Sequence, residues 1–245
     1  MSFHDGLPHA QKNELKPHLK AYWCIPPEAN AEFVACMEDV LDVYIRPRDP
    51  LRPLVTLDEA SKQLISETRP SIPMKPGRIE RVDAEYRRHG TASVFMLNAP
   101  LEGQRFVRVR DRRTRRDFAE VIRELCDEIY PDAEKIVLVM DNLNTHGIAS
   151  LYQAFEPEEA RRLARKLEIH YTPKHGSWLN MAEIELSVLS RQCMNRYFEN
   201  RQQLAQAIAD WERLRNENQT GIDWQFTTTT ARTKLKRLYP ILLDQ

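Results

Sequence analysis

The most informative chemical group in the sequence is a carboxylate at the mouth of a predicted buried strand. Asp141 follows five consecutive apolar residues, 136–140, which begin after the polar residue Lys135. Such a run fits a strand covered on both faces, and open α/β sheets bind ligands beyond the carboxyl ends of their strands. Asp141 is therefore a candidate site residue on its position alone.

Two further acidic pairs are candidates to join Asp141. Asp58 and Glu59 end a second strand-like run, and Glu183 and Glu185 open a later helical pattern. Strand alternation lets only one residue of the first pair face a ligand, and the helical repeat separates the second pair by about 200°. The residues alone leave both choices open.

Three carboxylates that converge on one point predict a metal site. They repel one another, so the arrangement is stable mainly when a divalent cation supplies positive charge. Oxygen ligands suit Mg²⁺ or Mn²⁺, and a pair of such ions can activate an attacking hydroxyl and stabilise the leaving oxygen of a phosphodiester. The acids therefore predict phosphoryl transfer on nucleic acid.

The same residues also have plain structural explanations. Asn180 and Glu183 have the spacing of a helix capping box, and Asp141 could open a polar turn or accept a phosphoryl group in a receiver-like sheet. His146 and His175 fall in predicted loops near the acids, where an imidazole could orient water or phosphate, although a loop histidine is more often incidental. We expect only a supporting role for the two histidines.

Hydrophobic periodicity predicts the elements that must position these groups. We expect strands at 54–58, 91–97, 105–109, 136–140 and 167–171, and helices from 30, over 118–129 and 157–167, and from 180 and 200. Asp117 and Glu120 have capping-box spacing at the start of the second of these helices. The order of strands, helix, strand, helix, strand, helix predicts an α/β sheet with covered faces.

Charge is balanced overall but unevenly distributed. The 36 basic and 36 acidic residues of the 245-residue chain cancel, which alone argues weakly against a nucleic-acid partner. The candidate phosphate contacts are Arg105, Arg108, Arg110, Arg112, Arg113, Arg115 and Arg116, together with Lys174 and His175. A later basic cluster, 232–237, fits a solvated face equally well.

Composition predicts a soluble protein with reduced thiols. No apolar stretch approaches the roughly 20 residues of a membrane span, and the first ten residues lack the order of a secretory signal. The four cysteines form no C-x-x-C pair, so neither a zinc site nor a disulfide framework is indicated.

Three ordered blocks of the sequence carry a family resemblance. They are Leu57-Asp58-Glu59, then Met140-Asp141-Asn142-Leu143-Asn144-Thr145-His146, then Thr172-Pro173-Lys174-His175-Gly176-Ser177-Trp178-Leu179-Asn180-Met181-Ala182-Glu183. The chain resembles bacterial insertion-sequence transposases related to the Tc/mariner group, and the similarity extends from about residue 12, through 23–27, to 234–238.

The resemblance implies a ribonuclease H-like catalytic domain, that is, a mixed sheet flanked by helices. Matched residue by residue, its Asp-Asp-Glu triad would be Asp58, Asp141 and Glu183, and the Leu-Asn-x-x-Glu block selects Glu183 over Glu185. The triad would bind two Mg²⁺ ions, for which Mn²⁺ can substitute. On this basis we expect an N-terminal linker and helix at 1–50, the catalytic domain at 51–199, and a C-terminal helix and basic tail at 200–245.

Two departures from the family pattern qualify the expectation. The 41 residues between Asp141 and Glu183, 142–182, exceed the spacing of the animal mariner relatives, and the helix expected at 157–167 could absorb them. Only about ten residues precede the block at residue 12, whereas full-length members carry a helix-turn-helix region there. We therefore expect a catalytic-domain fragment or truncated copy.

The function expected from the sequence is metal-dependent DNA hydrolysis and strand transfer at insertion-sequence ends. The partners would be element ends and target DNA, bound by a homodimer or larger assembly without a membrane, in the bacterial cytoplasm near the nucleoid. The alternatives are a catalytically silent remnant that binds DNA and interferes with the full-length transposase, and a ribonuclease H-like nuclease.

Overall fold

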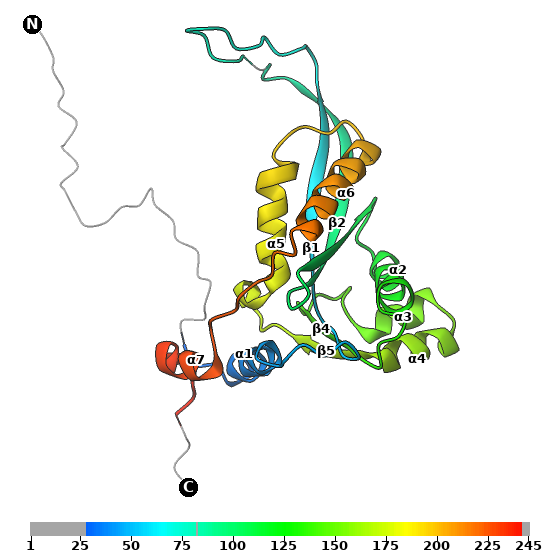
Figure 1. Ribbon diagram of the computed structural model, residues 1–245, viewed down its shortest axis with the longest axis vertical. Coiled ribbons are helices and arrows are strands. Elements are labelled where there is room, and N and C mark those ends of the chain that lie inside the picture. Colours follow the sequence, from blue (N-terminus) through cyan, green and yellow to red (C-terminus); the bar gives the residue numbers. More distant parts are fainter. Residues whose placement is uncertain (1–27, 82, 242–245) are drawn as a thin grey trace, which may run out of the picture.

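The helices and strands follow the predicted alternating order, with two short helices, α3 (Ile148–Ala154) and α7 (Thr228–Lys234), that were not expected. The computed structural model describes residues 28–81 and 83–241, which are coloured in Figure 1. The strands are β1 (Leu54–Glu67), β2 (Tyr86–Ala99), β3 (Gln104–Arg110), β4 (Ile136–Met140) and β5 (Leu167–Tyr171). The helices are α1 (Ala31–Tyr44), α2 (Arg115–Glu124), α3 (Ile148–Ala154), α4 (Pro157–Lys166), α5 (Met181–Leu189), α6 (Arg201–Glu217) and α7 (Thr228–Lys234). The resemblance at residues 12–15 and 23–27, and much of the expected 1–50 segment, lie outside the described residues.

The five strands form one mixed sheet in the order β3-β2-β1-β4-β5. β1, β2 and β3 are antiparallel neighbours, whereas β4 pairs in parallel with both β1 and β5. The carboxyl ends of β1, β4 and β5 therefore point toward the same edge of the sheet. Ligand sites of α/β sheets form at such an edge.

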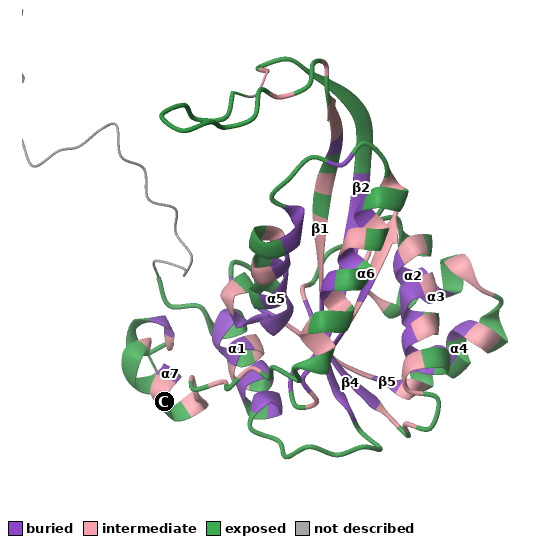
Figure 2. Ribbon diagram, turned by 45° about the horizontal axis from the view of Figure 1, so that its top comes forward, coloured by how far each residue is buried: buried purple, intermediate pink, exposed green. Residues whose placement is uncertain are grey.

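The central strand β4 is buried along its whole length, as its apolar run predicts. Ile136, Leu138 and Met140 pack into the core shared with α2, α3 and α4, whereas Val137 and Val139 pack on the opposite face against α1. Figure 2 shows these helices on opposite sides of the sheet. The predicted α/β class, a mixed sheet with helices on both faces, is confirmed.

α5 and α6 cover the same face of the sheet as α1. Leu186 and Leu189 of α5, and Leu204 and Ile208 of α6, join a cluster with the inner residues of β2. α1 and α6 both pack on the sheet that is formed by the residues between them. The division of the chain at residues 50 and 199 stays a prediction.

The strand that carries Asp58 is longer than its apolar run suggests. β1 does not end at Asp58 but runs on to Glu67, because its polar second half pairs with β2 as far as Tyr86. The two strands leave the body of the molecule as a projecting arm, whose tip is formed by the proline-containing segment 68–81 and by residues 83–85 (Figure 1). The prediction that β1 ends at the acid is therefore wrong, and Asp58 lies in mid-strand.

The cap of α2 also differs from the prediction. Thr114 and Asp117, not Asp117 and Glu120, form the capping box, with the Thr114 side chain accepting from the Asp117 amide and the Asp117 carboxylate accepting from the Thr114 amide. α2 therefore begins one turn earlier than expected. Within the described residues, none of the helices is long and apolar enough to cross a membrane.

Candidate active site

Asp58 and Asp141 are brought level with each other by the parallel pairing of β1 and β4. Thr56 of β1 lies opposite Val139 of β4, so two residues further along each strand Asp58 comes level with Asp141. Asp58 is on the sheet face opposite the α2 side, because Val55 and Leu57 of the same strand point into the core beneath α2. The β1–β4 register therefore sets the two acids side by side.

Glu183 is brought to the same place by the first turn of α5. The N-cap residue Asn180 is fully buried; its side-chain oxygen accepts from the Ala182 amide (3.1 Å), and its side-chain nitrogen donates to the Leu57 carbonyl (2.9 Å). The Asn180 amide donates to Ser177 O (2.7 Å) rather than to the Glu183 carboxylate, which a capping box would require. The cap thus ties α5 to β1 and leaves Glu183 available for a ligand.

The three acids named by the family resemblance line one cavity of about 440 Å³. Its wall contains Asp58, Asp141 and Glu183 together with Glu59, Asn180 and Ser177. The structure thereby decides the choice that the residues leave open on α5. The side chain of Glu185 is buried elsewhere, in an ion pair with Arg105 (2.9 Å), so Glu183 is the acid of this helix that reaches the cavity.

Burial and nearby negative charge both raise the pKa of Asp58. Burial is the largest influence and raises the pKa of this carboxyl group, and the nearby charges of Asp141 and Glu183 raise it further. A hydrogen bond from the Glu59 amide (2.7 Å) and the proximity of His146 act in the opposite direction, and the resulting pKa is about 6. The charges of Asp141 and Glu183 therefore lie close enough to act on Asp58.

Behind the cavity, His146 joins two carboxylates. Its Nδ1 lies 2.5 Å from Asp141 Oδ1 and its Nε2 lies 2.6 Å from Glu59 Oε1, and the ring stacks on Phe118 of α2. Burial alone would lower the pKa of His146, but the hydrogen bonds to the two carboxylates outweigh it and raise the pKa to about 9. Because carboxylates only accept, both ring nitrogens donate.

The donor set fits a divalent cation. It offers carboxylate oxygens, which Mg²⁺ and Mn²⁺ prefer, and no Lys, Arg or His is found among the described residues that line the cavity. Among the described residues, no three His, Cys, Asp or Glu side chains are already drawn together at metal-binding distances.

The predicted phosphate contacts divide into buried and exposed residues. Arg105 is fully buried against Glu185 and the Gly103 carbonyl, so its prediction as a DNA contact is wrong. Arg108 and Arg110 both pair with Glu124 of α2 and are about one quarter exposed. The charge of these two arginines is partly neutralised within the protein, and their contact with DNA stays a prediction.

The other predicted contacts are exposed near the carboxylate edge of the sheet. Arg110 is paired across β2 with a position level with Ser61 of β1, three residues after Asp58, so the loop that follows β3 lies at the same edge. This loop and the start of α2 carry Arg112, Arg113, Arg115 and Arg116, all exposed. Lys174 and His175 follow β5 at that edge, and His175 has a left-handed backbone conformation (φ 64°).

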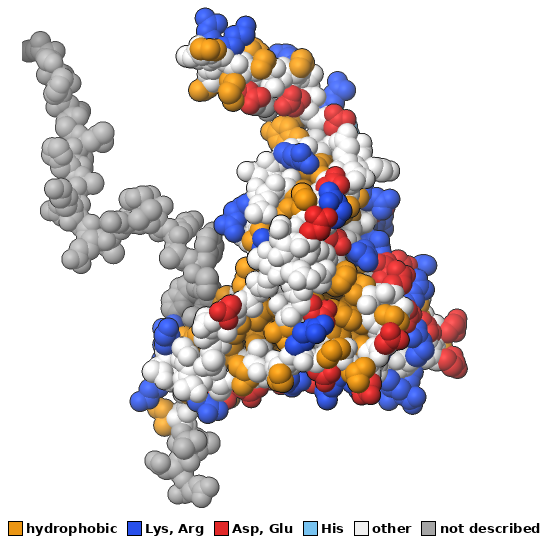
Figure 3. Space-filling model, viewed as in Figure 1, with side chains coloured by type: hydrophobic (Ala, Val, Ile, Leu, Met, Phe, Trp, Pro, Cys, Tyr) orange, Lys and Arg blue, Asp and Glu red, His pale blue; other side chains and the backbone are white. Residues whose placement is uncertain are grey.

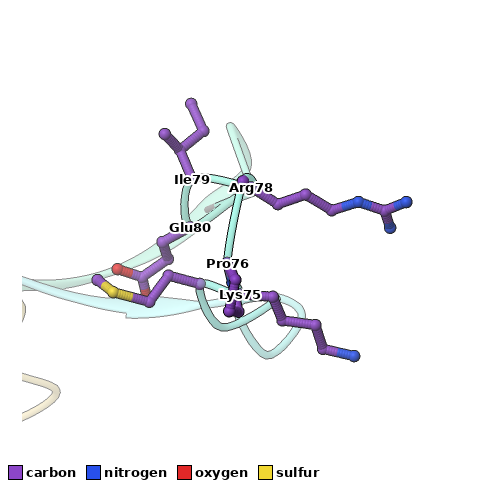
Figure 4. Close-up of a pocket in the computed structure, with 7 residues that line it drawn as sticks. Lys75, Pro76, Arg78, Ile79 and Glu80 are labelled. Atoms are coloured by element: carbon purple, nitrogen blue, oxygen red, sulfur yellow. The ribbon is translucent and has the colours of Figure 1, made fainter.

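One face of the molecule carries basic and acidic side chains intermixed. The face drawn in Figure 3 shows Lys and Arg alternating with Asp and Glu rather than one continuous basic surface. A larger hollow of about 610 Å³ lies at the tip of the projecting arm, lined by residues 74–80, from which Lys75 and Arg78 reach outward (Figure 4). It contains one acid, Glu80, so it cannot supply the three carboxylates of the predicted site. The carboxylate cavity is therefore the candidate active site.

The sequence did not reveal the connection made by Glu59. It gave Glu59 only as an alternative to Asp58 and gave His146 a supporting role, whereas in the structure they bond to each other 87 positions apart in sequence. The strand alternation that sends Asp58 to the cavity sends Glu59 to the opposite face. A histidine five residues after Asp141 was the available signal, but a loop leaves its direction undetermined.

Comparison with known proteins agrees with this geometry. No curated protein matches the chain. The chain is similar in structure to the Mos1 mariner paired-end complex with Mn (TM-score 0.55, 14% identity, covering 84% of this chain and 62% of that one) and to the Mos1 strand transfer complex (TM-score 0.55, 14% identity, 84% and 61%). It also resembles the Mos1 transposase paired-end complex with the left transposon end (TM-score 0.52, 14% identity, 81% and 59%).

The structural likeness shows a shared fold, and this chain spans about three fifths of each of those chains. It confirms the predicted ribonuclease H-like architecture. A family model described as DDE superfamily endonuclease matches residues 53–205, which is more than half of the sequence. The match encloses Asp58, Asp141 and Glu183 in order. The chain belongs to the DDE superfamily of endonucleases.

Proposed function

We propose that this chain is a transposase catalytic domain that cuts DNA at the end of an insertion sequence and joins the freed 3′-hydroxyl to target DNA. The observation that carries the proposal is the convergence of Asp58, Asp141 and Glu183, from β1, the end of β4 and α5, on one cavity. Membership of the DDE endonuclease superfamily supports it.

The three carboxylates would hold divalent cations, Mg²⁺ or Mn²⁺ and most simply two. When bound, such ions supply Lewis-acid activation of the attacking oxygen and stabilise charge on the leaving oxygen. One of the similar Mos1 structures is a complex with Mn, which supports this choice. Asp58 and Asp141 would share the ions and Glu183 would complete the second site.

Two phosphoryl transfers account for the overall reaction. In the first, a water oxygen attacks phosphorus as the bond to the 3′ oxygen breaks, which gives a 3′-hydroxyl and a 5′-phosphate. In the second, that hydroxyl attacks a phosphorus of the target and displaces a target 3′-hydroxyl, so one phosphodiester is exchanged for another. The protein's part is to hold the reacting groups in line.

Exposed basic residues at the same edge would position the DNA. Arg112, Arg113, Arg115 and Arg116, with the loop of Lys174 and His175, flank the carboxylate end of the sheet. Contacts of this kind fix the register of a duplex without reading its sequence. The similar Mos1 structures are paired-end and strand-transfer complexes, so we propose that this chain also acts on DNA as a dimer or larger assembly.

A strand-transfer assay tests the proposal. Purified protein is incubated in Mn²⁺ with supercoiled plasmid and with a pre-cleaved duplex that carries a free, labelled 3′-hydroxyl. Nicking of the plasmid or joining of the label is expected from the parent and not from D58N, D141N or E183Q. D132N is the matched control, because Asp132 is an exposed acid before the amino end of β4, at the opposite end of that strand from Asp141.

The alternative functions give different outcomes. If the parent and D141N bind the duplex but are equally inert, the enzyme proposal fails and a silent DNA-binding protein remains. If the parent cuts only an RNA–DNA hybrid included beside the duplex, the ribonuclease H-like nuclease replaces the transposase.

A further inference from the structure

A chain of three hydrogen-bonded side chains, of which the last two are buried, begins at the cavity. Asp141, at the cavity, is bonded to His146 (2.5 Å), and His146 is bonded to Glu59 (2.6 Å). The side chains of His146 and Glu59 are 0% and 2% exposed, whereas that of Asp141 is 32% exposed. Only the first member of the chain therefore faces solvent.

Asp141 is the acid of the three that most needs an external support. Asp58 lies within β1, between paired neighbours, and Glu183 lies on a capped helix. Asp141 begins the irregular segment 141–147 beyond the last residue of β4, where the backbone alone does not fix the side chain. A metal site, however, requires its ligands to be held within about 0.5 Å of the productive geometry.

The ring of His146 is itself held rigidly. It stacks on Phe118 with centroids 5.0 Å apart and an interplanar angle of 30°, and its backbone amide donates to Leu143 O (2.8 Å). Glu59 holds the far nitrogen of the ring, so neither a ring flip nor a rotation can occur without losing a buried hydrogen bond.

The state of Glu59 argues against a purely stabilising role for the chain. Its second oxygen, Oε2, is buried and has no hydrogen-bond partner in the described part of the protein. A buried, half-satisfied carboxylate costs stability, and a core optimised for stability alone would carry an apolar residue at this position. The presence of the acid is explained when its bond to His146 serves the site.

We propose that His146 and Glu59 are positioning residues for Asp141. Glu59 fixes the His146 ring, and His146 holds Asp141 Oδ1 so that the other oxygen, Oδ2, is left to bind a cation. The inference rests on the proposed function, because it assumes that Asp141 is a metal ligand. Strand β1 would then serve the site twice, with Asp58 in the cavity and Glu59 behind it.

Binding of Mn²⁺ to the DNA-free protein, measured from the electron paramagnetic resonance signal of free Mn²⁺, tests the inference separately from activity. The side-chain nitrogen of asparagine can take the place of His146 Nδ1, whereas that of glutamine takes the place of Nε2. H146N therefore keeps a donor for Asp141, and H146Q keeps one for Glu59 alone. We expect Mn²⁺ affinity to fall about 10- to 100-fold in H146Q and clearly less in H146N.

The result for each variant is compared with its thermal unfolding. If His146 served only to pack the core, H146N would lower the melting temperature at least as much as H146Q does. The two variants would then bind Mn²⁺ with the same affinity. E59Q is a second nearly isosteric variant, and it keeps an acceptor for His146. It should lose Mn²⁺ affinity only if the negative charge of Glu59 is needed to hold the His146 ring.

The two proposals fail in different ways. If the parent binds Mn²⁺, D141N does not, and H146Q binds as the parent does, the positioning role is overturned and the proposed function stands. If the parent binds no Mn²⁺, or binds it equally after D58N, D141N and E183Q, the proposed function itself is overturned, and the positioning role with it.

Discussion

The side-chain amide of Asn180 donates a 2.9 Å hydrogen bond to the backbone carbonyl of Leu57, the residue before Asp58. This bond joins the helix that carries Glu183 to the strand that carries Asp58. The same side chain caps α5 through its oxygen, so one residue both starts the helix and sets the helix against the sheet.

N180D should separate these two roles. Aspartate caps a helix as well as asparagine does, but it cannot donate to Leu57 O and places a charge beside that carbonyl. We expect a loss of about 1–3 kcal/mol in the free energy of unfolding and at least a tenfold loss of Mn²⁺-dependent cleavage.

N200D is the matched control for N180D. Asn200 caps α6 in the same manner, accepting from the Gln203 amide (2.9 Å), but it is exposed. Its substitution should change stability by less than about 0.5 kcal/mol and leave cleavage intact. Equal losses in the two variants, measured by urea denaturation and by plasmid nicking, would show that capping alone explains the effect.

The two acids on α5 should have different effects, because one supports the stability of the protein and the other supports its activity. Glu185 receives Arg105 (2.9 Å) and Arg215 (3.2 Å), and these hydrogen bonds hold its pKa below the ordinary value against the opposing effect of burial. E185Q leaves the buried Arg105 without its counter-charge and should lower the free energy of unfolding by about 3–5 kcal/mol.

E183Q should do the reverse of E185Q. It removes a charge that repels Asp58, so the metal-free protein should be as stable as the parent or slightly more stable while cleavage is lost. Denaturation curves without metal, and nicking assays with Mn²⁺, give the two measurements. A stability loss in E183Q as large as that in E185Q would contradict the assignment of the two acids.

The contribution of Asp58 to the stability of the metal-free protein should decrease as the pH rises from about 4 to about 6. The pKa of Asp58 is about 6 in the folded protein against an ordinary value of 3.8, so between these values the folded state binds more protons than the unfolded state. The contribution of the protonated group is fully present below about 4 and is lost as the pH rises through about 6.

The size of this pH effect is at most about 3 kcal/mol, because one pKa unit corresponds to about 1.4 kcal/mol. D58N should remove it, so the difference in melting temperature between D58N and the parent, measured in EDTA, should widen over this pH range in favour of D58N. A difference that stays constant from pH 4 to pH 7 would refute the raised pKa.

Exposed arginines beside the cavity should account for part of the salt dependence of DNA binding. Arg112 and Arg113 are exposed and form no ion pair within the described residues. If each contacts one phosphate, the double variant R112A/R113A should bind duplex DNA more weakly and reduce the slope of log K against log salt by about 2.

R232A is the control for the arginine pair. Arg232 is exposed, but its guanidinium binds Glu38 (2.7 Å) and it belongs to the separate basic cluster near α7. Fluorescence anisotropy over a series of salt concentrations should give parental values for this variant. A larger change in R232A than in R112A/R113A would show that DNA binds at the C-terminal basic cluster instead.

The sequence by itself determined the features that depend on neighbouring residues. The apolar run 136–140 is buried on both faces wherever it is placed, so β4 and the position of Asp141 at its end were predictable. Asn30, Asn180 and Asn200 start their helices through hydrogen bonds that span two or three residues. Caps and periodicity are local, and a sequence displays them directly.

Only the tertiary structure decided which side chains meet. Both Asp58 and Glu59 touch the cavity, but the packing of α5 on one face and α2 on the other left Asp58 beside Glu183 and buried the side chain of Glu59 against His146. The side chain of Glu185 binds an arginine 80 positions away in sequence and therefore does not reach the cavity. β1 continued past Asp58 because β2 supplied its hydrogen bonds. Burial and charge pairing are sums over such distant neighbours, and no short stretch of sequence contains them.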